Sequence, residues 1–195
     1  MSDKLISVVM PTSSRQHTHA SLLRALGSLK DTSTDFGQVE ILLRIDDDDP
    51  ERVNAVPELV SEFGVKEFIG PRGEGYNNMG GFVNDLMTLA TGKWSWLFDD
   101  DSWVSGNWQG ALQAVPCDPQ NGPACIAEFY HLGESQYTNF PTCSPPGLIM
   151  PTEAVKKLDS KNPVDCQWLS VIQQSNWKII CLPGVTYFHD GRIRA

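Results

Sequence analysis

Three consecutive aspartates, Asp99, Asp100 and Asp101, follow the apolar run "WSWLF" at residues 94–98. Two carboxylates separated by one residue at the end of a strand can share a hard divalent cation, Mg²⁺ or Mn²⁺, because these ions prefer oxygen ligands. Such a cation often completes its coordination shell with substrate phosphates. A solvated acidic turn or a helix N-cap is the alternative, because aspartate is common in both. The spacing alone leaves both interpretations open.

A second acidic cluster, "DDDDP", begins at Asp46 and follows the apolar run at residues 39–45. Asp46 comes first after this run and is the aspartate best placed to contact a ligand. A carboxylate there can accept hydrogen bonds from a base or a ribose hydroxyl, as acidic residues do in dinucleotide folds. Residues 47–49 are expected to form a solvated loop before Pro50.

Three further residues are candidates for the same site. Arg72 lies in a glycine-rich loop, where a guanidinium can bind phosphate or stack on a ring, although an exposed loop arginine is the alternative. Asp165 stands where a helix is expected to begin, so a plain N-cap competes with a catalytic role. His189 follows an apparent strand and can complete the shell of a metal, or be a structural histidine. Together these residues suggest a site for a cation and a nucleotide diphosphate.

The apolar runs of the first half predict a parallel sheet. Strands are predicted at four places, residues 5–11, 39–45, 65–70 and 94–98. Helices are predicted between them, at residues 21–29, 53–63 and 82–90. Strands that alternate with helices form an α/β domain, and its ligands bind at the carboxyl ends of the strands. The polar segments "PTSSR", "DDDDP" and "DDDS" each follow a strand, so they are expected to converge on one edge.

The second half is less regular. Residues 116–147 are rich in Pro, Gly, Cys and Asn and read as loops around the short strand in "ACIAEFYHL". Helices are predicted at 151–158 and 165–175, followed by two short strands in "KIICLP" and "VTYFHDG". Whichever of Trp94 and Trp96 faces inward is expected in the core, while Trp103 and Trp108 are candidates for lining a pocket.

Composition excludes several classes of protein. The chain has 195 residues and a formal net charge of −9, which disfavours a nucleic-acid partner because duplex binding relies on clustered Lys and Arg. No run approaches the ~20 apolar residues of a membrane span, and the first residues do not read as a signal peptide. The five cysteines form no C-x-x-C pair, which argues against a zinc site and a disulfide framework. A cytoplasmic protein with free thiols is expected.

Several segments, taken in order, resemble the GT-A glycosyltransferases, particularly family 2. "ISVVMPTSSR" resembles the opening strand of that family, and "ILLRIDDDD" resembles its second strand with the acidic nucleoside-binding turn. "GPRGEGYNNMGGFVNDLMTLATGKWSWLFDDDSW" resembles the stretch that leads into the Asp-x-Asp motif. "VDCQWLSVIQQSNWKIICLP" resembles the acceptor-side helix, and "YFHDG" follows at the place of a late histidine. The resemblance covers residues 5–104 and, more loosely, 147–191.

The resemblance implies a GT-A-like α/β fold, a mostly parallel sheet flanked by helices, with a smaller irregular acceptor-side region. Residues 1–195 would form one domain, with a nucleotide-binding half at 1–104 and an acceptor-side half at 105–195. It assigns nucleotide binding to six residues: Pro11, Thr12, Asp46, Arg72, Asp99 and Asp100. It assigns the cation, Mn²⁺ or Mg²⁺, to Asp101, Asp99 and His189, and the general base to Asp165.

The implied activity is cation-dependent transfer of a sugar from a nucleotide-diphosphate donor, with UDP favoured, to a hydroxyl acceptor with inversion. Two departures stand out: Val164 precedes Asp165 where the family often has Glu, and Ser102 replaces a common third acidic residue. The first departure favours an alternative, a non-catalytic GT-A-like module that binds nucleotide or sugar. A sugar-nucleotide nucleotidyltransferase fits less well, because "PTSSRQHTH" lacks the glycines of its phosphate loop. A plain α/β domain with acidic turns and no shared site is the remaining alternative.

Overall fold

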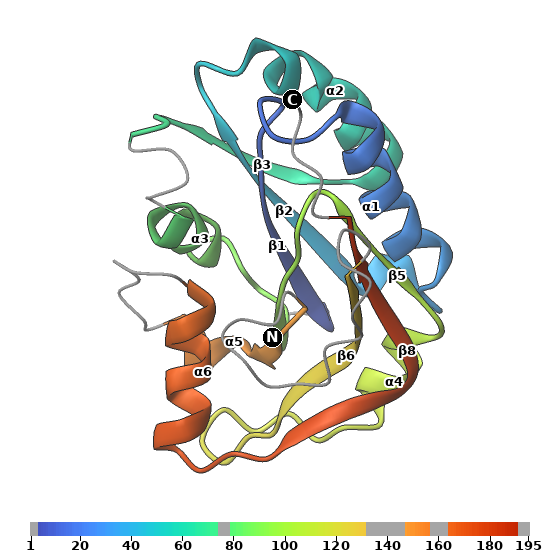
Figure 1. The fold of residues 1–195 in the computed structure, drawn as a ribbon, viewed down its shortest axis with the longest axis vertical. Helices are drawn as coiled ribbons and strands as arrows, with labels where there is room; N and C mark the ends of the chain where they lie inside the picture. The colour runs from blue at the N-terminus through green and yellow to red at the C-terminus, as the bar shows by residue number, and fades with distance from the viewer. Residues whose placement is uncertain (1–3, 74–78, 132–146, 157–163, 191–195) are drawn as a thin grey trace.

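The computed structural model describes residues 4–73, 79–131, 147–156 and 164–190, without the side chains of 129–131 and 164–167. The described chain forms one eight-stranded sheet in the order β3-β2-β1-β4-β7-β6-β8-β5 (Figure 1). The strands are β1 (Ile6–Thr12), β2 (Val39–Asp46), β3 (Lys66–Gly70), β4 (Trp94–Leu97), β5 (Ser102–Ser105), β6 (Ala124–His131), β7 (Ile149–Pro151) and β8 (Ile179–His189).

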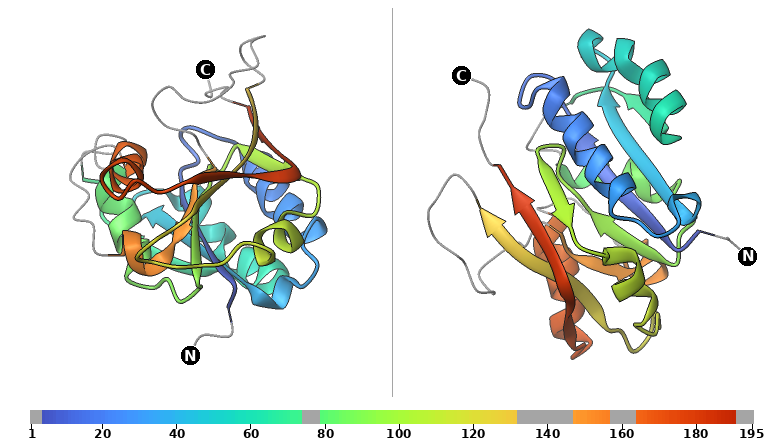
Figure 2. Two further views of the ribbon diagram at one scale, coloured as in Figure 1. Left: turned by 90° about the horizontal axis from the view of Figure 1, so that it is seen from below. Right: turned by 90° about the vertical axis from the view of Figure 1, so that its right-hand side faces the viewer.

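Helices cover both faces of the sheet, as two views of the ribbon show (Figures 1 and 2). The helices are α1 (His19–Asp31), α2 (Pro50–Phe63), α3 (Met79–Met87), α4 (Trp108–Gln113), α5 (Thr152–Val155) and α6 (Val164–Gln174), with a 3₁₀ turn, η1 (Phe36–Gln38). Buried side chains of α1, α2 and α4 form one core cluster with the sheet, and those of α3, α5 and α6 form a second. No helix in the described ranges is both long enough and apolar enough to cross a membrane.

The first half of the sheet is parallel. Strand β1 pairs in parallel with β2 and with β4, and β2 pairs in parallel with β3. Strand β7 joins β4 and β6 in antiparallel pairs, and β8 pairs in parallel with β6 and antiparallel with β5. Apolar runs predict β1, β2 and β4 well because a strand covered by helices on both faces is apolar throughout. The prediction of a mostly parallel α/β sheet flanked by helices is confirmed.

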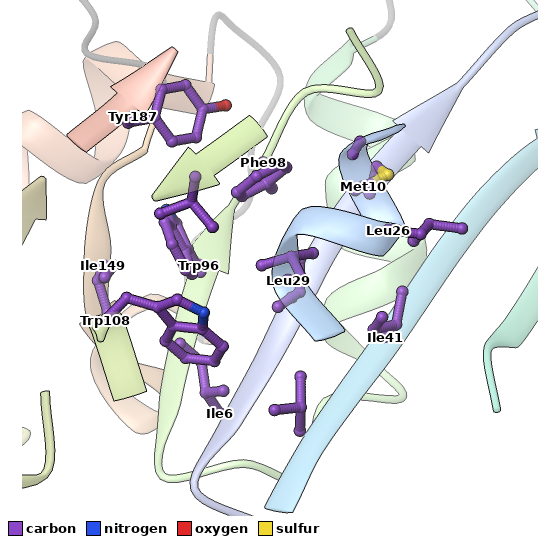
Figure 3. Close-up of a cluster of buried hydrophobic side chains, with 14 of the residues drawn as sticks. Ile6, Met10, Leu26, Leu29, Ile41, Trp96, Phe98, Trp108, Ile149 and Tyr187 are labelled. Atoms are coloured by element: carbon purple, nitrogen blue, oxygen red, sulfur yellow. The ribbon is translucent and has the colours of Figure 1, made fainter. Parts of the chain in front are cut away.

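An aromatic cluster forms the centre of the larger core (Figure 3). The ring of Trp96 lies 5.0 Å from that of Phe98 and 5.2 Å from that of Trp108, between ring centroids, and Tyr187 closes the group 4.9 Å from Phe98. Trp94 is buried in the same cluster as Trp96. Two corrections follow. Trp94 and Trp96 are both core, because residues two apart on a strand face the same side, and Trp108 packs in the core instead of lining a pocket.

Other boundaries differ from the sequence prediction. The two short strands predicted at the C-terminal end are one strand, β8, which continues through Pro183 and Gly184 because a register shift against β6 accommodates them. The described part of the helix predicted at 151–158 is the short α5, and Pro151 belongs to β7. Helix α2 begins at Pro50 and continues through Pro57. Strand β5 and helix α4 were not predicted.

Candidate functional site

The three aspartates form a tight turn, hereafter the acidic turn (Asp99–Asp101), between β4 and β5. The chain leaves β4 beside β1, where the Phe98 backbone N–H donates to the Val9 carbonyl at 3.1 Å. It re-enters the sheet at Ser102, which pairs with His189 across β5 and β8. Asp100 and Asp101 are buried, at 5% and 1% exposed. The acidic turn is therefore part of the packed structure and is not a solvated loop.

Asp100 ties the acidic turn to β1 and α2. Its Oδ2 accepts a hydrogen bond from the Thr12 hydroxyl at 2.6 Å and lies 3.5 Å from Nη2 of the buried Arg52. Arg52 also donates from Nε to the Thr12 hydroxyl at 2.9 Å. Burial raises the pKa of the Asp100 carboxyl, although His17, Thr12 and Arg52 oppose the rise. Sequence reasoning missed Arg52, which fixes the geometry of this end of the sheet.

Asp101 lies between two imidazoles. Its Oδ2 is 3.7 Å from Nδ1 of His17, and its Oδ1 is 3.4 Å from Nε2 of His189. His189 arrives there because it pairs with Ser102, one residue from Asp101, in the β5–β8 ladder. His17 comes from the loop after β1, and sequence reasoning missed it. The sequence signal for His17 was its position shortly after β1, which ends at the same edge of the sheet as the acidic turn.

Asp99 lies against Tyr187, which was also not predicted. The Asp99 backbone N–H donates to the Tyr187 hydroxyl at 3.1 Å, and this hydroxyl donates to Asp99 Oδ2 at 3.2 Å. Burial and the neighbouring charges of Asp101 and Asp100 raise the pKa of Asp99 to about 7. Burial and the charge of Asp99 also raise the pKa of Tyr187 well above its usual value. A positive charge at this turn would therefore stabilise the ionised carboxylates.

The donor set fits a divalent cation. The structure brings the predicted ligands Asp99, Asp101 and His189 together, with one ligand atom from each within 4.8 Å of the others. His17, Asp100 and Asp101 form a second such group. Carboxylate oxygens with an imidazole suit Mn²⁺, and carboxylates with water and phosphate suit Mg²⁺.

A hollow near the acidic turn is lined by four of the six predicted nucleotide-binding residues: Pro11, Thr12, Asp46 and Arg72. It is open to solvent, and its empty space, counted out to the mouth, is about 480 Å³. Its lining residues come from the ends of β1 and β2 and from the following loops and α3: Pro11, Thr12, Ser13, Arg15, Gln16, Arg44, Asp46, Arg72, Met79 and Phe82. We call this hollow the strand-end pocket.

Two arginines that were not predicted hold Asp46 in the strand-end pocket. Arg44 Nη1 lies 3.2 Å from Asp46 Oδ1, and Arg15 Nη1 lies 3.3 Å from Asp46 Oδ2. Burial raises the pKa of Asp46 despite these cations. The Arg44 guanidinium also stacks 4.4 Å above the Phe82 ring. A charged residue inside the apolar run "ILLRI" was the signal for Arg44.

The prediction of a solvated loop at residues 47–49 is wrong for Asp49. Its side chain is buried and accepts hydrogen bonds from the backbone N–H groups of Ser14, at 2.7 Å, and Arg52, at 3.2 Å. Burial opposes ionisation, but the hydrogen bonds from Ser14 and Arg52 lower the pKa of Asp49 overall. Asp49 is thus the N-cap of α2 and fixes the loop after β1, while Asp47 and Asp48 are exposed.

Arg72 and Asp165 are the two predicted site residues that remain to be placed. Arg72 is exposed at the rim of the strand-end pocket. Asp165 is the second residue of helix α6, in agreement with a predicted helix start, but its side chain lies outside the described part of the chain. Its role as a base therefore stays a prediction.

Comparison with known proteins identifies the fold. No family model and no curated protein sequence matches the chain. Among solved structures, S. aureus TarS superposes with a TM-score of 0.73 at 14% identity, over 95% of this chain and 36% of that one. The fold is GT-A-like. TarS 1–349 in complex with UDP-GlcNAc gives a TM-score of 0.66 at 13% identity, over 98% of this chain and 60% of that one.

A structure of TarS 1–349 in complex with UDP also matches, with a TM-score of 0.66 at 13% identity, over 95% of this chain and 60% of that one. The chain thus spans less than two thirds of each of these TarS chains. At such identities the likeness establishes the arrangement of strands and helices. The chemistry has to be argued from the residues of this chain.

Proposed function

We propose that this protein is a cation-dependent glycosyltransferase that moves a sugar from a nucleotide-diphosphate donor to a hydroxyl acceptor. One observation carries the proposal: Thr12 lines the strand-end pocket and also donates its hydroxyl hydrogen bond to Asp100. The pocket and the acidic turn are therefore joined through one residue, which supports placing a nucleoside in the pocket and its diphosphate at the turn. The match to TarS structures with UDP and UDP-GlcNAc supports UDP as the nucleotide.

In this proposal the nucleoside occupies the strand-end pocket. Asp46, held by Arg44 and Arg15, accepts hydrogen bonds from the base or ribose, and Pro11 and Thr12 form the wall beside it. Arg72 at the rim contacts the base or the phosphates.

The diphosphate would lie at the acidic turn. Asp99, beside the ribose, Asp101 and His189 would hold Mn²⁺ or Mg²⁺, and Asp100 keeps the turn docked on β1. The cation supplies positive charge that stabilises the departing diphosphate.

The acceptor step is assigned to Asp165. As general base it would take the proton of the acceptor hydroxyl, whose oxygen attacks the anomeric carbon with inversion. We also propose membership of family 2. Residues 1–104 would be the nucleotide-binding half and 105–195 the acceptor-side half of a single domain.

A GT-A-like module that binds nucleotide or sugar without transfer is a second candidate. The residue before Asp165 favours it, because Val164 stands where the family often has Glu. The two candidates differ in one observable. A transferase releases UDP from its donor, whereas a binding module retains the donor intact.

The test is release of UDP from a panel of UDP-sugars that includes UDP-GlcNAc, in the presence of Mn²⁺, with water or a hydroxyl acceptor as the attacking group. We expect release by the wild type, a loss of at least ~100-fold in Asp101→Ala, and no change in the exposed control Asp47→Ala. Asp165→Asn should bind the donor but lose release. Donor binding without release by the wild type would favour the binding module.

A further inference from the structure

The imidazole of His17 lies at the acidic turn, and the proposed transfer gives it no role. Its Nδ1 is 3.7 Å from Asp101 Oδ2, and its Nε2 is 3.8 Å from Asp100 Oδ1. The side chain is 14% exposed, so it belongs to the packed wall of the site. One ring nitrogen of such an imidazole can join carboxylate oxygens in holding a transition-metal ion.

The backbone around His17 is fixed by contacts that do not involve a ligand. The His17 carbonyl accepts a hydrogen bond from Nη2 of the buried Arg52 at 3.0 Å, and its backbone N–H donates to the Ser13 carbonyl at 3.1 Å. The next residue, Thr18, is the N-cap of α1 and accepts from the Ser21 N–H at 3.1 Å. The fold therefore presents the His17 ring to the acidic turn in advance of any ligand.

The carboxylate of Asp101 presents one oxygen to each histidine. Oδ2 faces His17, and Oδ1 faces His189 at 3.4 Å. Two donor groups share Asp101: one adds Asp99 and His189, and the other adds His17 and Asp100. A carboxylate that offers its two oxygens to different donor groups is placed to bridge two cations, as in two-metal sites.

The charge at the turn is consistent with a second cation. Of the three carboxylates, Asp100 forms an ion pair with Arg52 at 3.5 Å, which offsets one negative charge. One divalent cation offsets the charges of Asp99 and Asp101. A nucleotide diphosphate adds further negative charge, which a second divalent cation would offset.

We propose that the acidic turn binds two divalent cations that share the carboxylate of Asp101. The first is the cation of the proposed function, on which this inference rests, held by Asp99, Asp101 and His189. The second is held by His17, Asp100 and Asp101. Because each position includes an imidazole, Mn²⁺ and similar transition-metal ions are bound in preference to Mg²⁺.

The experiment counts Mn²⁺ ions on the full chain by calorimetry and by the electron paramagnetic resonance signal of unbound Mn²⁺. The wild type should bind two equivalents, and His17→Ala and His189→Ala should each bind one. His19→Ala is the matched control, since His19 is two residues further on, at the start of α1, and faces Glu58 at 3.8 Å; this variant should still bind two. Bound Mn²⁺ should give an exchange-coupled spectrum in the wild type, because bridged ions lie about 3.5–4 Å apart, and an isolated-ion spectrum in His17→Ala.

A single Mn²⁺ on the wild type, bound equally well by His17→Ala, would overturn the second position. If that single ion still requires Asp101 and His189, the proposed function stands while this inference fails. If no Mn²⁺ binds to the wild type, both fail. The number of Mn²⁺ ions bound by the wild type tests the second position even if His17→Ala does not fold. His17→Gln, which keeps a polar side chain at this position, provides a second variant.

Discussion

The sheet carries buried carboxylates at both ends of its parallel strands, and their surroundings differ. At the amino end, Glu40 accepts hydrogen bonds from the hydroxyl of Ser7 at 2.5 Å, the backbone N–H of Thr91 at 2.8 Å and Nζ of Lys66 at 2.6 Å. Burial opposes ionisation, but these donors lower the pKa of Glu40 overall. At the carboxyl end, burial, Asp101 and Asp100 raise the pKa of Asp99 to about 7.

The difference separates a structural carboxylate from a ligand-binding one. Glu40 is surrounded by donors that the chain itself supplies, and its role is to fasten the loop before β4 to β1 and β2. The carboxylates of the acidic turn crowd against one another, so their ionised forms gain from an added cation. Substitutions at the amino end should therefore reduce stability, and those at the carboxyl end should reduce ligand binding.

The largest expected loss of stability follows replacement of Glu40. Glu40→Ala leaves the buried hydroxyl of Ser7 without its acceptor and Lys66 without its ion-pair partner, and we expect a loss of about 3 kcal/mol in the free energy of unfolding. Urea denaturation measures it. Glu67→Ala, an exposed carboxylate on β3, is the control and should change stability by less than about 0.5 kcal/mol. Equal losses in the two variants would contradict the structural role assigned to Glu40.

Gly92, in the loop that Glu40 fastens, tests how closely that loop packs. A Cβ at Gly92 would lie 2.5 Å from the carbonyl carbon of Ile6, which the β1 backbone cannot relieve by a side-chain movement. Gly92→Ala should therefore lose about 2 kcal/mol of unfolding free energy. Gly27→Ala in α1 meets nothing within 4 Å and should gain up to about 1 kcal/mol, because alanine is the better helix former. An unchanged free energy of unfolding in Gly92→Ala would contradict the close packing of this loop on β1.

Replacing Asp99 should stabilise the protein slightly, in contrast to the losses above, when a chelator has removed all cations. Because its folded-state pKa of about 7 lies above the ordinary 3.8, ionised Asp99 reduces stability as the pH rises between these values. Between pH 4 and 8 the free energy of unfolding of Asp99→Asn should therefore rise relative to that of the wild type, by about 1 kcal/mol after solvent screening.

Glu40→Gln provides the opposite comparison in the same thermal-denaturation series. The pKa of Glu40 is lowered below 4.5, so the stability it adds is present above that pH and is lost as the pH falls through its folded-state pKa. The advantage of the wild type over Glu40→Gln should therefore shrink toward acid pH. Parallel pH profiles for the Asp99 and Glu40 variants would contradict the assignment of roles.

Sequence patterns predict the sheet and its functional edge because both depend on local signals. The apolar runs before Thr12, Asp46 and Asp99 mark strands buried on both faces, and the carboxyl ends of parallel strands meet at one edge. The structure accordingly places Thr12 and Asp46 in one pocket, and Thr12 donates a hydrogen bond to Asp100, the residue after Asp99.

The remaining features depend on contacts between distant segments. His17 reaches Asp101 because Arg52 of α2 holds the loop after β1, and no local pattern encodes that contact. Asp49 reads as one member of an acidic loop, yet Ser14 makes it a buried cap. Pro183 reads as a break between strands, but the register shift against β6 keeps β8 continuous.

In the proposed function, a cation at the acidic turn helps to hold a nucleotide in the strand-end pocket. Calorimetric titration of UDP and GDP, each with and without Mn²⁺, on the wild type and Asp101→Ala tests it most directly. We expect Mn²⁺-dependent binding of UDP by the wild type and its loss in Asp101→Ala, with thermal denaturation showing that the variant is folded. Absence of binding for both nucleotides under every condition would contradict the proposed function, and the acidic turn would then be a structural turn.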